Sequence, residues 1–347
     1  MSIAVQRRRG TTAEHATFTG LLGEITVDTD KDTLVAHDGA LAGGYPMARE
    51  DAVTNPNILI NSDGTNPVNQ LGVADADSVT HASYSLDGWK DDADTVTSNQ
   101  DIQSDSFGAI ATSTDTGSIG KYQPLEDFVK LRGKTITLSA GVISNTALAI
   151  LRVYDDANND SEFHSGGGTE ETLSVTLDIR SAASMVLAMF KVSGAITTGD
   201  YIRITWIKLE VGSVATKFVA DLPSVNLAKC HRRMFSIGGV LYQTIGHGFV
   251  NNPSTGYITL KLPVPMSSTP ALAYGPLSAF RLISNGNTYF PTSIAYRANF
   301  GTTDGDGNID GVGLLVTYST AGMTVDEPCL LTITNNTAAY LRLTNNP

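Results

Sequence analysis

The chain has 347 residues, including 33 Gly and 13 Pro, and a formal net charge of −12 at pH 7. This length allows two or three domains, and turn-forming residues scattered along it favour many short strands. The acidic balance argues against a general nucleic-acid-binding protein, because such proteins need a net basic face to release counterions from phosphates.

The sequence contains no membrane-spanning or secretory pattern. No run of eighteen apolar residues occurs, and no apolar segment accompanies the basic run Arg7–Arg9. We therefore expect that the protein is made in the cytoplasm and does not insert into a membrane. The arginine run is interpreted as a solvated or inter-subunit charge cluster, with a nucleic-acid arm as the alternative. Cys230 and Cys329 make no disulfide framework and are expected to be buried thiols.

Residues 7–50 predict a β-hairpin. Apolar and polar residues alternate in Glu24–Asp28 and in Thr33–His37, and the acidic bend at residues 29–32 separates the two segments. An isolated two-stranded hairpin is marginally stable in water. We therefore expect this segment to pack against other copies of itself or against a larger particle.

The middle of the chain predicts an antiparallel sandwich of the jelly-roll kind at residues 57–220. Residues 51–56 are expected to be a linker, and the polar stretch from residue 62 to 130 is expected to form long surface loops. Apolar residues then alternate with polar ones at 135–142 and 172–179, which is typical of strands with one buried face. Tyr201–Val211 is a further predicted strand.

Residues 221–236 contain a helix candidate, Leu222–Ser236, with Ser224 as its expected cap and Gly238 just beyond its end. In a trimer it could pack around the three-fold axis; lying on its own domain is the alternative. Residues 237–347 predict a second β-sandwich from three strand-like segments: 257–262, 313–318 and 330–334.

The first fifty residues contain four distinctive sequence segments: GTTAEHATFTG, EITVDTDK, VAHDGA and GGYPMAR. They resemble the N-terminal segment shared by many bacteriophage tail-fibre and tropism proteins, including the major tropism determinant of a Bordetella phage. The resemblance implies that residues 1–50 form a trimeric, β-prism-like base that joins the protein to other tail or baseplate proteins of the virion. It brings no catalytic or ligand residue.

A second resemblance spans about residues 57–236, in NILIN, SLDGW, LRGKTITLSA, GDYIRITWIKLEVGSVATKFV and CHRRMF. These segments resemble a jelly-roll module of phage tail fibres that is itself similar to carbohydrate-binding modules. At residues 62–72, SDGTNPVNQLG stands where a phenylalanine and an Arg-Gly pair are usual. No ligand site of that family is therefore carried over.

One loop places oxygen side chains at every second position, as in the first half of an EF-hand: Asp304, Asp306, Asn308 and Asp310. The position for the bidentate glutamate is Leu315, so the loop is incomplete. A bound calcium ion and a plain glycine-rich turn both fit this pattern, and no other cofactor is expected.

The sequence offers one further candidate metal ligand and one candidate glycan-binding group. His247 could bind a metal if three copies met on a trimer axis, and a buried or surface histidine is the alternative. Tyr289, Phe290, Tyr296 and Asn299 are the candidates for glycan binding, because aromatic rings stack on sugars.

Taken together, the sequence predicts an all-β homotrimeric phage tail-fibre or receptor-binding protein, carried in the virion. It would attach through residues 1–50 and adsorb to a bacterial surface polysaccharide or receptor through residues 237–347. A purely structural spike or head fibre is the alternative. A glycan depolymerase is third: no nucleophile or phosphate-loop motif occurs and no internal period of 20–50 residues is visible, so we expect no enzyme.

Overall fold

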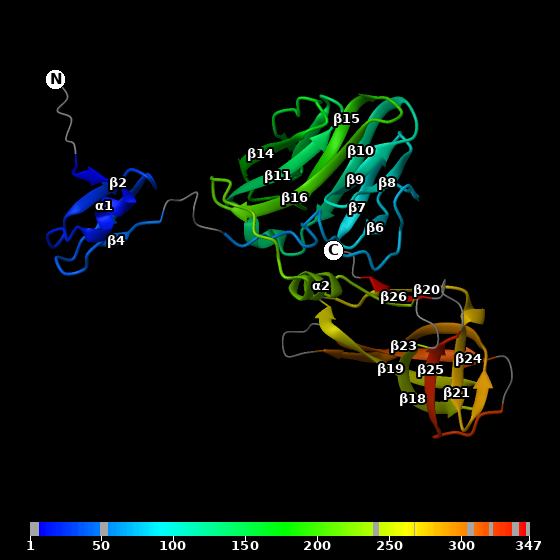
Figure 1. Cartoon of the computed structure of the whole chain (residues 1–347). Helices are drawn as coiled ribbons and strands as arrows, with labels where there is room; N and C mark the ends of the chain where they lie inside the picture. The colour runs from blue at the N-terminus through cyan, green and yellow to red at the C-terminus, as the bar shows by residue number, and fades with distance from the viewer. Residues whose placement is uncertain are drawn as a thin grey trace. The chain divides into compact units, whose positions relative to one another are not determined.

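The structure is a computed structural model of the whole chain (Figure 1). It describes residues 7–48, 55–238, 243–266, 268–303, 309–318, 322–334 and 340–344. Two compact units are present: Met1–Pro56 with Val214–Val219, and Asn57–Ser213 with Ala220–Pro347. Strands dominate both units, so the expected all-β fold is confirmed.

The N-terminal unit contains a four-stranded sheet in the order β1-β2-β3-β4. The strands are β1 (Arg9–Gly10), β2 (Ile25–Asp28), β3 (Thr33–Ala36) and β4 (Tyr45–Pro46). The predicted hairpin is β2–β3, in which Ile25 lies opposite Ala36. The edge strand β1 pairs with β2 in parallel.

A short helix, α1 (Thr12–Thr17), follows β1 and was not predicted. Its N-terminus is a capping box: Glu14 N donates to Thr11 Oγ1 at 3.2 Å, and Thr11 N donates to Glu14 Oε2 at 2.7 Å. The reciprocal bonds satisfy two backbone donors that a helix start otherwise leaves open. The T-x-x-E pattern at residues 11–14 was the available signal.

The central domain is a sandwich of two six-stranded antiparallel sheets. Sheet I has the order β13-β12-β15-β10-β7-β6 and sheet II the order β14-β11-β16-β9-β8-β5. Sheet I comprises β6 (Tyr84–Leu86), β7 (Trp89–Asp94), β10 (Asp115–Pro124), β12 (Ala149–Tyr154), β13 (Asn158–Asp160) and β15 (Leu187–Ile196). Sheet II comprises β5 (Ser78–Val79), β8 (Ser98–Ile102), β9 (Phe107–Ala111), β11 (Thr135–Ser144), β14 (Glu170–Asp178) and β16 (Tyr201–Val211).

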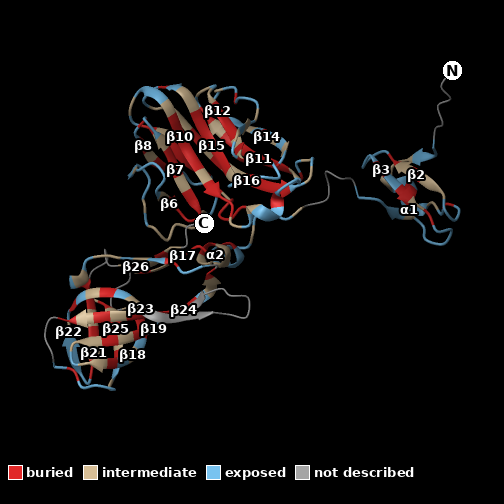
Figure 2. Ribbon diagram, turned by 180° about the vertical axis from the view of Figure 1, so that it is seen from behind, coloured by how far each residue is buried: buried red, intermediate tan, exposed pale blue. Residues whose placement is uncertain are grey.

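Three aromatic rings join the two sheets at the centre of the apolar core. Trp89 and Phe190 come from sheet I and Phe107 from sheet II, with ring centroids 5.4 Å (Trp89–Phe190) and 5.9 Å (Phe107–Phe190) apart. All three side chains are fully buried, and buried positions run along the strands of both sheets (Figure 2). Edge-to-face packing of such rings adds to the free energy gained by burying their area.

The expected long surface loops between residues 62 and 130 are wrong from residue 78 onward, where the structure has β5–β10 and a 3-10 helix (Phe128–Leu131). The sequence pattern did not predict these strands, because their inward-facing positions include polar residues. Ser85, Asp91, Gln100 and Lys121 are all buried. An alternation test that counts only apolar residues cannot recognise such strands.

The Lys121 ammonium links these polar residues inside the sandwich. Its Nζ donates to Ser85 Oγ and Asp91 Oδ1 at 2.6 Å each and to Gln100 Oε1 at 2.5 Å. Lys121 and Asp91 belong to sheet I, whereas Gln100 belongs to sheet II. Burial lowers the pKa of Lys121, and the charge of Asp91 opposes that shift. All three ammonium hydrogens thus have an oxygen partner.

The C-terminal part begins with α2 (Pro223–His231) and contains two sheets. A three-stranded sheet has the order β17-β26-β20: β17 (Met234–Gly238), β26 (Tyr340–Thr344) and β20 (Ala271–Tyr274). A seven-stranded sheet has the order β22-β21-β25-β18-β19-β24-β23 and surrounds a second apolar core. Its strands are β18 (Thr244–Asn252), β19 (Thr255–Met266), β21 (Phe280–Ser284), β22 (Asn287–Tyr289), β23 (Pro291–Thr303), β24 (Ile309–Tyr318) and β25 (Pro328–Ile333), with a 3-10 helix at Leu277–Ala279.

The predicted helix is shorter than expected and starts differently. It ends at His231, because Met234 and the following residues pair with β26 as a strand. Leu222 occupies the N-cap position without a side-chain hydrogen bond, so the expected capping by Ser224 is wrong. Pro223 is the first helical residue, where its fixed φ favours helix initiation.

Both cysteines are buried free thiols, as expected. Burial raises the pKa of Cys329 to about 11 and raises that of Cys230 further, so neither thiol is activated as a nucleophile.

Lys121→Met should destabilise the sandwich by about 3–5 kcal/mol, because it leaves the Asp91 carboxylate buried without its cation. The double variant Lys121→Met/Asp91→Ala should regain part of this loss. Guanidinium unfolding followed by tryptophan fluorescence measures both, with Lys130→Met at an exposed position as the control. A single variant as stable as the control would contradict the role given to the cluster.

Candidate functional site

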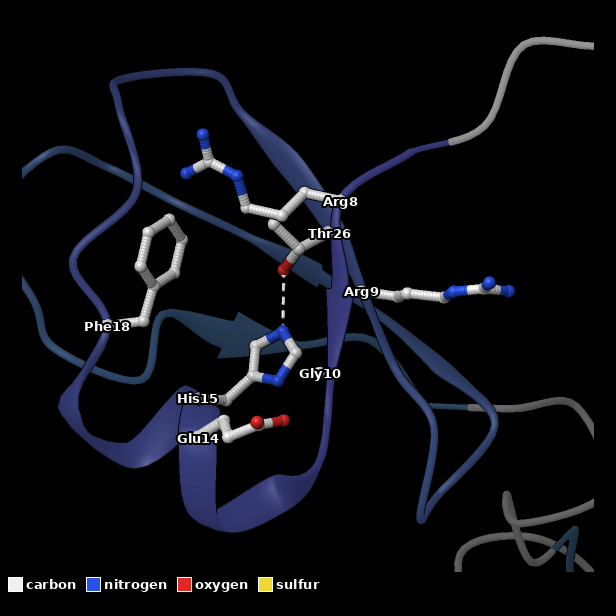
Figure 3. A pocket seen from close by; sticks show the side chains of 7 residues that line it. All are labelled: Arg8, Arg9, Gly10, Glu14, His15, Phe18 and Thr26. Carbon is white, nitrogen blue, oxygen red and sulfur yellow. Dashed lines mark hydrogen bonds between the residues drawn. The ribbon is translucent and has the colours of Figure 1, made fainter.

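A pocket of about 200 Å³ opens in the N-terminal unit (Figure 3). It is lined by Arg8, Arg9, Gly10, Glu14, His15, Phe18 and Thr26. The side chains beneath it are polar: His15, Thr26 and His37 are buried and hydrogen-bonded in series. Within the described residues, neither apolar cluster includes a residue from this unit, whose one buried hydrophobic side chain there is Val35.

The hydrogen-bond partners define where the protons lie when both imidazoles are neutral. His15 Nδ1 faces the carbonyl of Thr11 at 3.0 Å and must donate, so its Nε2 accepts from the Thr26 hydroxyl at 2.8 Å. Thr26 Oγ1 then accepts from His37 Nε2 at 2.9 Å, and His37 Nδ1 accepts from the backbone of Gly20. The Thr26 hydroxyl therefore hydrogen-bonds to both imidazoles and links His15 to His37.

A larger cleft, of about 640 Å³, lies on the outer face of sheet I. Side chains alternate across a strand, so the β7 residues Lys90, Asp92 and Asp94 face outward whereas Trp89 and Asp91 face the core. Across the register, each has neighbours on β10 and β15. The rows are Lys90–Tyr122–Met189, Asp92–Gly120–Lys191 and Asp94–Ser118–Ser193.

An ion pair crosses the middle row above Gly120. Lys191 Nζ lies 2.5 Å from Asp92 Oδ2, although β10 separates their strands and their backbones are roughly 10 Å apart. Asp92 also accepts a hydrogen bond from Ser118 Oγ at 2.9 Å. A Cβ at position 120 would lie 2.2 Å from the carbonyl oxygen of Phe190, so only glycine fits beneath this pair.

Lys90 is the second cation of the cleft, and its surroundings differ. Its Nζ lies over the ring of Tyr84, 5.0 Å from the centroid, and Tyr122 neighbours it on β10. Within the described residues no carboxylate forms an ion pair with it, and desolvation lowers the pKa of Lys90. Burial raises the pKa of the adjacent Tyr122 phenol, and the charges of Asp92 and Asp91 add to the shift.

One wall of the cleft is apolar. It is built by the end of β10, the following 3-10 helix and the start of β15: Leu125, Phe128, Met185, Val186, Leu187 and Met189. The cleft therefore offers an apolar surface beside charged and hydroxyl groups, the combination that small-molecule sites use.

The predicted glycan residues have unequal surroundings. Phe290 is 57% exposed, with the Arg281 guanidinium 3.8 Å from its ring centroid. Tyr289 and Tyr296 pack partly against the C-terminal core, and their hydroxyls donate to the carbonyls of Gly322 and Pro270. The side chain of Asn299 lies outside the described residues.

The predicted metal residues lie mostly outside the part of the chain that the structure describes. Asp304, Asp306 and Asn308 lie outside the described residues, as does the side chain of Asp310. His247 is exposed on β18. Across the described ranges, no three His, Cys, Asp or Glu side chains gather as a metal site would require. In the same part of the chain, no helix is both long and apolar enough to cross a bilayer.

The first residues of the chain are similar to a known phage domain. The family model of the major tropism determinant N-terminal domain matches residues 5–41. This segment is similar to the N-terminal domain of tropism determinants, as its sequence motifs indicated. A particular relative, the "Tail fiber receptor-binding protein" of Bordetella phage BPP-1, is 72% identical over 53 residues. That region is 15% of this chain and 14% of the relative.

Solved structures add similarities that are too weak for argument. The "Major Tropism Determinant P3c Variant" is 29% identical over 40% of this chain and 29% of its own, with a TM-score of 0.15. The CBM22-1–CBM22-2 tandem domain of Xyn10C from Paenibacillus barcinonensis is 10% identical over 85% of this chain and 99% of its own, with a TM-score of 0.29. We draw no conclusion about fold or ligand from either overlay.

The cleft was not predicted from the sequence. Its signal was the spacing Lys90-x-Asp92-x-Asp94, which places three charges on one face of a strand. The spacing alone does not indicate a strand, because no apolar alternation accompanies it.

Thr26→Val should weaken the N-terminal unit by about 1–3 kcal/mol, because both imidazole nitrogens that face the hydroxyl lose their partner while remaining buried. Thr26→Ser keeps the hydroxyl and should retain most of the stability. Amide hydrogen exchange of residues 15–37 in the full chain measures the difference. Equal protection in the valine and wild-type proteins would show that the hydroxyl is not needed.

Proposed function

We propose that this protein is a receptor-binding component of a phage tail fibre. Residues 1–50 would attach it to other tail or baseplate proteins, and the part from Asn57 onward would adsorb to a glycan on the bacterial surface. The observation that carries the proposal is the N-terminal match to a relative named as a tail fiber receptor-binding protein. We expect the mature protein in the virion and no catalytic activity.

Two surfaces could meet the receptor. The C-terminal domain was the expected contact, and there Phe290 is the exposed aromatic ring. The cleft on sheet I is the more enclosed surface and combines an apolar wall with charged groups. The cleft is therefore our first candidate for glycan contact, with the Arg281–Phe290 pair second.

Self-association through the N-terminal unit is part of this proposal. Leu21 and Leu22 are 78% and 82% exposed. Other large apolar side chains of the unit are also exposed to solvent: Leu34, Leu41, Tyr45 and Met47. A unit that buries histidines and threonine while exposing leucines gains stability when copies cover those leucines. This supports self-association at the N-terminal end, and the number of three chains comes from the resemblance of residues 1–50.

Leu21→Asp/Leu22→Asp should reduce the mass in solution from three chains towards one, because charged side chains oppose burial in an interface. Sedimentation velocity of the full chain measures the change. Phe163→Asp, at a similarly exposed position in the sandwich, should leave the mass unchanged. A wild-type mass of one chain would contradict the proposal.

Purified full-length protein, added to the bacterium first, should reduce adsorption of the virion, because free and virion-borne copies compete for one receptor. Deleting residues 1–50 should remove the protein from assembled particles. Unchanged adsorption despite saturating protein would favour the structural spike. Shortening of the surface polysaccharide by the protein alone would favour the depolymerase.

A further inference from the structure

We propose that the cleft on sheet I binds a saccharide that carries an acidic group, and that Lys90 provides the cation that pairs with it. The inference rests on the proposed function, because it names the chemical class of the receptor glycan. It concerns the outer face of β7, β10 and β15, away from the aromatic residues singled out in the C-terminal domain.

The two lysines of the cleft are not equivalent. His81, the other basic side chain of the lining, has its Nδ1 3.7 Å from Asp92 Oδ1. Lys191 is neutralised by Asp92, which also accepts from Ser118. Glu126 is likewise occupied, since Arg232 Nε lies 3.3 Å from its Oε2. Asp94 is exposed at the edge of the row. Lys90 is thus the cleft's cation without a carboxylate partner in the described chain.

The position of Lys90 makes an incoming anion favourable. The ammonium is half-buried between Tyr84 and Tyr122, and part of its hydration is lost without compensation by a nearby negative charge. A carboxylate or phosphate placed there would form a charge-assisted hydrogen bond in a partly desolvated site.

The remaining surface suits a sugar. Pyranose rings present C–H groups on their faces and hydroxyls around their edge, so they require apolar and hydrogen-bonding surfaces side by side. Phe128 and Met185 line the same cleft as the polar rows and belong to its apolar wall. The Tyr122 hydroxyl, next to Lys90, makes no hydrogen bond within the described residues and can donate to or accept from a ligand.

The test uses full-length protein and surface polysaccharide from the bacterium to which the virion adsorbs. Three preparations are compared by biolayer interferometry: native polymer, polymer with its carboxyl groups reduced to alcohols, and polymer stripped of phosphate. We expect one of the two treatments to weaken wild-type binding at least about tenfold, which also identifies the acidic group.

The protein side of the test uses matched variants. Lys90→Gln should weaken binding to the native polymer at least about tenfold, and Lys90→Arg should retain most of it. Lys130→Gln removes an exposed lysine outside the cleft, one that pairs with Asp127, and should bind as wild type. Rising salt should weaken wild-type binding more than binding by Lys90→Gln.

The inference is overturned if Lys90→Gln binds as wild type, or if both neutralised polymers bind as the native one does. In either case, wild-type protein that still blocks adsorption leaves the proposed function standing. Wild-type protein that binds neither cells nor native polymer would overturn both.

Discussion

The buried Lys121 ammonium is the interaction on which the sandwich and its cleft depend. It holds oxygens from both sheets, and those contacts require Asp91 and Lys121 to face inward. Because side chains alternate across a strand, this choice turns Lys90, Asp92 and Tyr122 outward. A slip of one residue would place the outer row in the core. The internal cation, together with the buried Trp89 on the same face of β7, thus determines which residues line the outer face.

The interior of the sandwich and that of the N-terminal unit differ in composition. The sandwich surrounds three aromatic rings with aliphatic residues and also contains a buried hydrogen-bonded cluster around Lys121. The N-terminal unit has a capped helix, short strands and a hydrogen-bonded His15–Thr26–His37 interior. Hydrogen bonds are directional, so such an interior fixes geometry well while contributing little net free energy. That contrast is consistent with a segment that completes its stability by association.

Strands are predicted correctly from the sequence where one face of the strand is uniformly apolar. Ile136, Leu138 and Ala140 alternate cleanly, and β11 lies there. Prediction failed on β7 and β10, where polar residues occupy both faces, and at α1, whose six residues are too short for helical periodicity. The end of α2 was missed because pairing with β26, more than one hundred residues away, overrides local preference. The cleft joins residues of three strands through register, which no local pattern encodes.

The polar interior of the N-terminal unit also affects its response to temperature. The heat capacity of unfolding rises with the apolar area exposed and falls with the polar area exposed. A unit with a histidine–threonine interior therefore has a smaller heat-capacity change per residue than the aromatic-cored sandwich. Its free energy of unfolding curves less with temperature, so the unassociated unit weakens little on cooling.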